Sequence, residues 1–308
     1  MTTTVDTILD RARSVATRRH VRENVQAYLF LLPSLAVLSF VYLYPMLQLF
    51  YLSVFRVNTV ADMVYVGLNN FRRMIEHEQF RGALQHNAQL FPAVPIILVL
   101  ATFLAALLNE RMHGWRFYRA IIFLPYVLPV PVIGIAFTQM LQLHGVFNTI
   151  LTQLGLGFLA QDWLGNTDIN MYVIMSVIVW KELGFATILF LARLLSVPQE
   201  LYEAAEIDGA GWWHRLWSVT VPQLKGIMAT WAILEMFGLL SWVFGYIYTM
   251  TIGGPGNSTV VLEFFIYKMA FYYTGELGLA AGVATLLFSI ALITIPLRTW
   301  LEGVSYED

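Results

Sequence analysis

Long apolar stretches separated by shorter polar segments dominate the pattern along the chain. A helix needs about 20 largely apolar residues to cross the hydrocarbon core of a bilayer. Six stretches meet that length, namely residues 27–54, 88–108, 120–141, 171–195, 226–250 and 277–297. The pattern therefore predicts an all-α integral membrane protein with six spans.

Composition narrows the class further. The 308 residues are 58% hydrophobic and only 12% charged, whereas an average soluble domain is about 25% charged. So few charges cannot cover the surface of a soluble enzyme, and a net charge of −2 provides no basic surface for nucleic acid. The chain has no cysteine, and its six histidines lack the spacing of a metal site, so we expect no bound metal.

The positive charges predict the orientation. With the N-terminus inside, the cytoplasmic segments hold twelve of the 18 Lys and Arg residues and the exterior segments hold five, with Lys181 inside the fourth span. Both termini are therefore predicted to be cytoplasmic, with a tail over residues 1–26, a six-span domain over 27–300 and a second tail over 301–308. An amphipathic helix is expected at residues 71–84, on the exterior. Kinks are expected in the first and third spans, which contain the prolines Pro33, Pro45, Pro125, Pro129 and Pro131.

The predicted cytoplasmic loop, residues 196–225, differs from the other loops in length and pattern. Helix signals run to about Asp208, where Gly209 permits a sharp turn. A second short helix is expected over residues 212–219, and Pro222 marks the entry into the fifth span. By physics alone, an amphipathic hairpin anchored at the lipid headgroups by its tryptophans explains the loop equally well.

The same loop resembles the EAA loop of ABC importer permeases, E-A-A, three residues, G, nine residues, I-x-L-P. Here Glu203, Ala204 and Ala205 are followed at the same spacing by Gly209 and by Val219-Thr220-Val221-Pro222, with valine in place of Ile and Leu. Asp208 before the glycine is typical of the carbohydrate-uptake subfamily, the maltose and glycerol-3-phosphate type. Two outer segments also resemble family motifs, residues 67–71 (G-L-x-N-F) and residues 251–259 (T-x-G-G-P-x-x-x-T).

The resemblance implies a six-helix type I importer bundle and a division of labour. The first helix of the loop would be the coupling helix, with Glu203 bonding to an ATP-binding subunit, Ala204 and Ala205 allowing close approach, and Gly209 making the turn. The chain itself would hold no cofactor and catalyse no reaction, because ATP and magnesium would be bound by partner ATPase subunits. The implied partners are a second homologous permease in a heterodimer, two ATP-binding subunits and an extracytoplasmic solute-binding protein. The implied location is a bacterial or archaeal cytoplasmic membrane.

Ionisable residues within the spans mark a candidate pathway, because buried charge is costly in a membrane. They are Lys181, Glu182 and Glu235. Lys181 and Glu182 are adjacent, so we expect them to point about 100° apart rather than to pair. A helical stripe is expected to suit a sugar through its carboxylate and two aromatic rings, and comprises Glu235, Gly238, Trp242, Tyr246 and Thr249.

Each of these features has an alternative interpretation. Glu235 could pair with a basic residue and hold the bundle together, while Trp242 and Tyr246 could belong to the outer aromatic belt. Gly278 and Gly282 form a GxxxG pattern, for which we expect packing against the partner permease or the fifth span.

Three other functions compete with a sugar importer. The solute could be a polyol, a glycerol phosphate or an amino acid, although the Asp208-Gly209-Ala210 form argues against the last. A secondary transporter could use Glu235 as a proton site, but no internal repeat is visible. A membrane-embedded enzyme would need clustered nucleophilic or acid–base groups, and none cluster.

Overall fold

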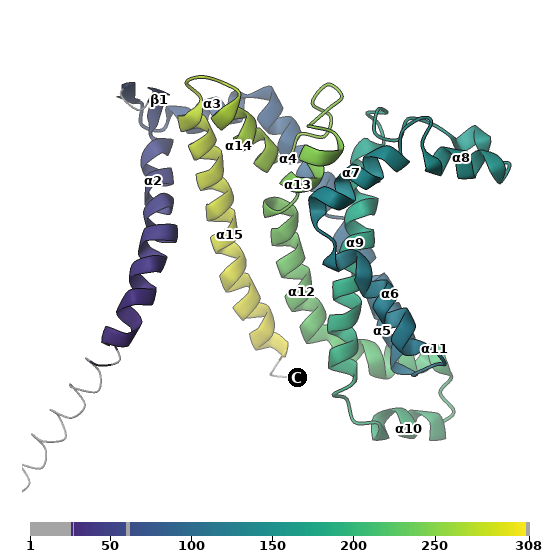
Figure 1. The fold of residues 1–308 in the computed structure, drawn as a ribbon. Coiled ribbons are helices and arrows are strands. Elements are labelled where there is room, and N and C mark those ends of the chain that lie inside the picture. The colour runs from purple at the N-terminus through teal and green to yellow at the C-terminus, as the bar shows by residue number, and fades with distance from the viewer. Residues whose placement is uncertain (1–25, 27, 60–61, 306–308) are drawn as a thin grey trace, which may run out of the picture. The chain divides into compact units, whose positions relative to one another are not determined.

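The computed structural model describes residues 26, 28–59 and 62–305, and divides into two units, residues 1–52 and 53–308 (Figure 1). Most of the predicted N-terminal tail (residues 1–25) and the last three residues of the C-terminal tail lie outside the described part. Residues 301–305 continue the last helix, so the predicted boundary at residue 300 is not a helix end.

The first unit contains the first predicted span. Its helix runs over Tyr28–Ser53, with a π-helical turn η1 (Ser39–Leu43) followed by α2 (Tyr44–Ser53). Pro45 lies one residue after the start of α2, lacks an N–H, and crowds the carbonyl four residues earlier. The wider π turn directly before it makes room for that ring. Tyr28–Ser53 is one helix, and the kink expected in this span stays a prediction.

The second unit begins with a short hairpin that the sequence did not predict. Strands β1 (Phe55–Thr59) and β2 (Asp62–Tyr65) pair antiparallel, with Phe55 opposite Tyr65. Two helices follow, α3 (Asn69–Glu76) and α4 (Glu78–Leu90), so the amphipathic segment expected at residues 71–84 is split at His77.

The G-L-x-N-F segment fastens this outer region. Gly67 has a φ of +55°, a conformation that suits glycine. Asn70 is buried and its Nδ2 donates to the carbonyls of Ser53 (2.9 Å) and Phe55 (2.8 Å). A Cβ on Gly278 would collide with the Phe55 carbonyl, whereas one on Gly282 would contact Asn70 at an ordinary 3.8 Å. Gly278 therefore packs against this segment, and the expected packing on the fifth span is wrong for it.

Six helices in the described part of the second unit correspond to the second to sixth predicted spans. They are α5 (Ala93–Asn109), α6 (Trp115–Val127), α7 (Val130–Met140), α9 (Asn170–Leu194), α12 (Val221–Ser241) and α15 (Leu277–Ser305). Among the described residues of both units, four helices are long and apolar enough to cross a membrane, or five if the bent α6–α7 pair counts as one span. The stretch Leu277–Leu292 is a shorter apolar helix.

Prolines shape the third predicted span. Helices α6 and α7 meet at a bend of 96°. Leu128 is extended between them because the residue before a proline is pushed out of helical geometry, and Pro129 and Pro131 follow. The predicted kink is therefore a sharp corner.

The core lies where α5, α9 and α12 meet. Helix α5 makes its most extensive contacts with α9, and α6 packs on α9 as well. Gly184 brings the backbones of α9 and α6 together, because a Cβ there would strike the Ile122 carbonyl. Fully buried side chains fill this region, among them Leu90, Ile97, Ile174, Phe190, Leu224 and Leu239.

The outer loop after α7 forms a separate arm. It contains α8 (Val146–Gln153) and a 3₁₀ turn, η2 (Gly157–Leu159). Buried Asn148 organises the arm, since its Nδ2 donates to the carbonyls of Leu143 (3.0 Å) and Gln161 (2.7 Å) while its Oδ1 accepts from Trp163 (2.8 Å).

Candidate functional site

The predicted cytoplasmic loop folds as two helices joined by a glycine turn. Helix α10 spans Glu200–Ile207, ends at Asp208, and is followed by Gly209 with a φ of +79°. Helix α11 (Trp212–Arg215) continues through the π turn η3 (Leu216–Thr220) into α12, whose first turn contains Pro222. The predicted end of the first helix near Asp208 and the turn at Gly209 are confirmed. The short helix predicted over residues 212–219 is not a separate element, because α11, η3 and α12 run as one helix from Trp212 to Ser241.

Helix α10 has no buried residue, although most helices of the second unit do. Glu203 and Ala204 are exposed, Ala205 is half-buried, and Ile207 is 87% exposed. Figure 1 shows α10 and α11 at the opposite end of the bundle from α3 and α14. The E-A-A segment is thus presented at the surface of the end that is predicted to be cytoplasmic.

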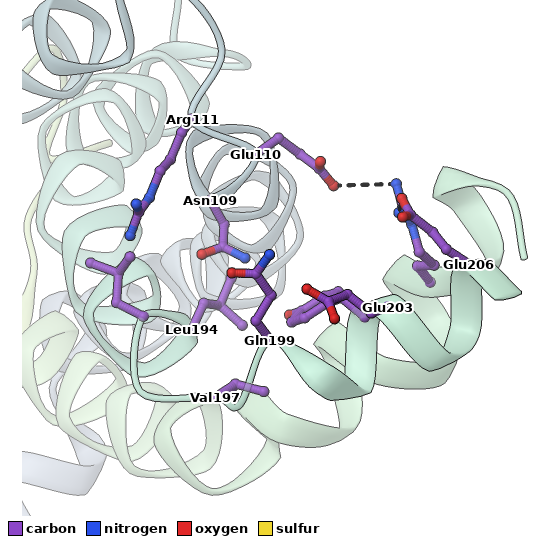
Figure 2. A pocket seen from close by; sticks show the side chains of 11 residues that line it. Asn109, Glu110, Arg111, Leu194, Val197, Gln199, Glu203 and Glu206 are labelled. Carbon is purple, nitrogen blue, oxygen red and sulfur yellow. Dashed lines mark hydrogen bonds and ion pairs between the residues drawn. The ribbon is translucent and has the colours of Figure 1, made fainter.

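A polar cavity of about 480 Å³ separates α10 from the bundle (Figure 2). Glu110 at the end of α5 and Glu203 and Glu206 on α10 supply its carboxylates. Arg215 pairs with Glu206 and, through Nη2, with Glu110 Oε1 at 3.5 Å. The cavity is therefore spanned by one arginine between two helices.

Lys181 lies in the middle of α9 and is buried. Its Nζ donates to the carbonyl of Tyr126 (3.1 Å) and lies 4.5 Å from the centre of the Tyr126 ring. It also pairs with Glu182 Oε1 at 3.5 Å. The expectation that Lys181 and Glu182 do not pair is wrong, because both side chains are long enough to curve together where an unpaired charge would be costly.

The fifth span is broken, which changes the predicted stripe. Helix α12 ends at Ser241, and a separate helix α13 (Phe244–Met250) follows. The predicted span over 226–250 and its single stripe are wrong in this respect. Glu235 and Trp242 still adjoin Gly238, since a Cβ on Gly238 would lie 3.5 Å from the Trp242 ring and 4.0 Å from Glu235 Oε2.

The carboxylate of Glu263 holds this break. Glu263 lies in the first turn of α14 (Leu262–Phe271), and its Oε2 accepts from the N–H of Phe244 at 2.6 Å. Burial raises the pKa of Glu263 to about 7, opposed by the N–H groups of Phe244 and Val243. Glu263 and Trp242, which is 73% exposed, line an open cavity of about 520 Å³. The sequence reasoning missed Glu263, and its position directly after an apolar loop was the only local signal.

Two tyrosines join the charged residues. Tyr246 is buried in α13, away from exposed Trp242, and its hydroxyl has no hydrogen-bond partner among the described residues. Glu182 and Glu235 nevertheless act electrostatically on this hydroxyl and on that of Tyr126. The structure thus gathers Glu182, Glu235 and Tyr246 from three helices, and adds Tyr126, which the sequence did not single out.

Thr249 leaves the predicted stripe. It lies against Gly134 of α7, where a Cβ on Gly134 would strike the Thr249 side chain. Its hydroxyl donates to the carbonyl of Gly245 at 2.7 Å. Thr249 therefore belongs to the α7–α13 contact rather than to the charged group.

The outer T-x-G-G-P-x-x-x-T segment is closed by its own threonines. The hydroxyls of Thr251 and Thr259 lie 2.7 Å apart, and Thr259 Oγ1 also donates to the carbonyl of Gly254 (3.1 Å). Gly253, with a φ of +81°, leaves no room for a Cβ beside Phe264. The motif residues thus form one compact turn.

Among the described residues, no group of three or more His, Asp or Glu side chains could hold a metal ion.

Comparison with known proteins identifies the family of the chain. The family described as "Binding-protein-dependent transport system inner membrane component" matches residues 97–302.

Individual relatives match over nearly the whole chain. The probable ABC transporter permease protein YurN of Bacillus subtilis is 33% identical over 277 residues, 88% of this chain and 94% of that protein. The trehalose/maltose transport system permease protein MalF of Thermococcus litoralis is 33% identical, covering 88% and 91%. The lactose transport system permease protein LacF of Rhizobium radiobacter is 32% identical, covering 85% and 88%.

The fold is also similar to that of a solved structure. A chain of a bacterial ABC transporter involved in the import of alginate superposes with a TM-score of 0.77, covering 94% of this chain and 98% of that one. The two chains are 22% identical in sequence. This likeness concerns the fold alone.

Proposed function

Because the chain belongs to the family of binding-protein-dependent transport system inner membrane components, we propose that it is the membrane permease subunit of an ATP-driven importer of a sugar or oligosaccharide. Relatives named for trehalose and maltose, lactose and diacetylchitobiose support this solute class. A polyol or a glycerol phosphate is the alternative solute.

One structural observation carries the proposal. Helix α10 presents Glu203 and Ala204 at the surface, on a helix with no buried residue, beside a polar cavity. The exposed Leu201 and Ile207 side chains give this short helix apolar surface that a partner protein can cover. Docking to an ATP-binding subunit gives it one, and Glu203 can make charge-assisted hydrogen bonds there.

The proposed assembly has four kinds of subunit. The chain pairs with a second, homologous permease as a heterodimer, and two ATP-binding subunits hold the ATP and magnesium. An extracytoplasmic solute-binding protein delivers the solute, and the complex resides in a bacterial or archaeal cytoplasmic membrane. In this scheme the chain supplies the pathway. When the two ATP-binding subunits bind ATP and close on each other, the permease pair changes from inward-facing to outward-facing by a rigid-body motion of the hinge type.

The proposed pathway passes the residues gathered near the break in the fifth span. Trp242 offers an exposed ring on which the apolar face of a sugar can stack. Glu235 can accept hydrogen bonds from sugar hydroxyls. The Lys181–Glu182 pair and the Tyr246 hydroxyl are the other polar groups of the proposed pathway, and because Lys181 and Tyr246 are buried in this structure, a solute reaches them only after the helices move.

The first test is co-purification of the tagged chain in detergent. We expect an ATP-binding protein and a second permease to accompany the wild type, and Glu203→Ala to lose the ATPase or its coupling to transport. Glu200→Ala changes an exposed glutamate of the same helix outside the E-A-A motif and serves as the control. A chain that purifies alone, with Glu203→Ala unchanged, contradicts the proposal and favours a secondary transporter centred on Glu235.

The second test concerns the pathway. Trp242→Ala is expected to impair uptake without loss of the protein from the membrane, because the ring contributes to solute contact and little to packing. Trp217→Ala removes a ring of similar exposure (65% against 73%) at the coupling end and is the matched control. Normal uptake by Trp242→Ala and Glu235→Ala would remove both residues from the pathway.

A further inference from the structure

The coupling loop contains an ion-pair bridge that the E-A-A motif does not explain. On its C-terminal side, helix α10 is connected to the bundle through the turn at Gly209. This turn is open, because no atom lies within 4 Å of the position that a Cβ on Gly209 would take. A helix without buried residues and with an open glycine turn can move separately from the bundle unless side chains fasten it.

Two side chains on one face of α10 provide that attachment. Tyr202 and Glu206 are four residues apart and so lie one above the other on the helix. The Tyr202 hydroxyl lies 3.3 Å from Thr220 Oγ1 in η3, and Glu206 pairs with Arg215. Both contacts lead to the second helix of the loop.

Arg215 extends the attachment to α5. Its planar guanidinium can bond two carboxylates at once, and its Nη2 reaches Glu110 at the C-terminal end of α5. The Arg215 side chain is only 14% exposed, whereas Glu206 is 60% exposed and Glu110 45%. The arginine is therefore the least exposed member of the bridge.

The helix that carries Arg215 is seated on the same face of α5. The Trp212 ring packs edge-on against Phe103 at 5.6 Å, and Phe103 lies seven residues, about two turns, before Glu110. Helix α5 in turn packs most extensively on α9, which carries Lys181 and Glu182. A continuous series of contacts thus joins α10 to the charged residues of the proposed pathway.

Another arginine near the loop does not make this connection. Arg193 donates to Ser196 Oγ (2.9 Å) and to the carbonyl of Gln223 (3.2 Å), joining the end of α9 to the start of α12. Within the part of the chain that the structure describes, Arg215 is the one cation paired with α10.

We propose that Arg215 is a positioning residue for coupling, which clamps α10 to the cytoplasmic end of α5 through Glu206 and Glu110. A displacement of α10 by an ATPase subunit then moves α5 and α9 with it, rather than bending the loop. This inference rests on the proposed function.

The test compares transport with ATP hydrolysis in the complete complex, reconstituted in proteoliposomes with the solute-binding protein. We expect Arg215→Gln to lower solute transported per ATP hydrolysed by about tenfold, within the range of typical couplings between sites, while assembly and ATP hydrolysis persist. Arg215→Lys keeps the charge but cannot hold both carboxylates, so an intermediate ratio is expected. Arg193→Gln is the matched control and should leave the ratio unchanged.

A cross-link supplies the rescue. The chain has no cysteine, so Glu110→Cys and Glu206→Cys can be introduced into Arg215→Gln and joined by a short thiol-reactive linker, with partner subunits free of accessible cysteine. Joining the two positions should restore the transport ratio, which a general loss of stability would not allow. If Arg215→Gln fails to assemble, Glu110→Gln and Glu206→Gln replace it, and each should lower the ratio.

The outcomes separate the two proposals. A wild-type complex without ATP-driven uptake contradicts the proposed function. A wild-type complex that transports normally, with an unchanged ratio in Arg215→Gln or in both glutamine variants of the glutamates, overturns only the role of Arg215.

Discussion

The two ends of the second unit are held together in different ways. At the outer end, buried amides and hydroxyls bind backbone groups of distant segments, as Asn87 does for Leu239 and Leu262. At the coupling end, α10 is held by the Tyr202–Thr220 contact and by partly exposed charges around Arg215. Buried hydrogen bonds are costly to break, while exposed ion pairs contribute little to stability.

This difference indicates that the interactions at the two ends serve different purposes. The outer end is built to keep one geometry, and the coupling end is attached firmly enough to transmit movement but contributes little to folding. Elements that move are expected to come from the less stable parts of a protein. The following changes test this contrast, in order of expected effect.

Gly278→Ala should be the most damaging change. Its Cβ would collide with the Phe55 backbone carbonyl, which cannot move without disturbing the hairpin, so we expect a loss of about 3 kcal/mol. Gly282→Ala meets only ordinary contacts and gains helix propensity, so it should be neutral or stabilising. Apparent Tm in detergent measures both, and equal effects would contradict this packing.

Asn87→Ala tests the buried amides of the outer end. The change leaves the Leu239 carbonyl and the Leu262 N–H without their partners, with an expected cost of about 2 to 3 kcal/mol. Asn69→Ala alters an exposed amide in the neighbouring helix α3 and should shift the apparent Tm little. A small effect at Asn87 would show that the outer end does not depend on this bond.

Glu263 predicts a dependence on pH. Its pKa is raised to about 7 in the folded protein, so the folded state keeps a proton that the unfolded chain loses near pH 4.5. Its contribution to stability is present below pH 4.5 and is lost as pH rises through about 7. The total is at most about 3.4 kcal/mol, for a pKa that rises by about 2.5 at 1.36 kcal/mol per pKa unit.

Apparent Tm measured from pH 5 to 8 checks this, and Glu263→Gln should remove the corresponding part of the slope. Glu78→Gln, at an exposed position in the first turn of α4, is the control and should keep the slope. A wild-type slope in Glu263→Gln would mean that another group titrates.

Tyr202→Phe should have the smallest effect on stability, about 1 kcal/mol or less, because it removes a single hydrogen bond. Amide hydrogen exchange should nevertheless become faster within α10 alone. Protection of α10 that is unchanged in this variant would show that the Tyr202–Thr220 contact does not restrain the helix.

Local patterns were sufficient for the first half of the coupling loop. The end of its first helix and the glycine turn at Gly209 depend on residues a few positions apart and were predicted, whereas the separate helix expected over residues 212–219 continues into the fifth span. The long apolar stretches likewise gave the main helices, because hydropathy is a property of each segment by itself.

The failures involve contacts between distant segments. Residues 242–250 are apolar enough to continue a helix, so the break after Ser241 was invisible without Glu263, some twenty residues later. The Lys181–Glu182 pair needed the surroundings of Tyr126 to show that both charges turn inward. The seat of Gly278 likewise depended on a hairpin more than 200 residues earlier in the chain.

The closed turn at residues 251–259 has a consequence for recognition. Its backbone is held by Thr259 Oγ1, which donates to the Gly254 carbonyl (3.1 Å). Its side chains are held by the Thr251–Thr259 hydroxyl pair and by Asn170 Nδ2, which donates to Ser258 Oγ (2.6 Å). A partner that meets this turn therefore does not have to order a flexible loop, and the conformational entropy was lost when the chain folded. Complementarity of shape, rather than induced ordering, then determines how well such a partner fits.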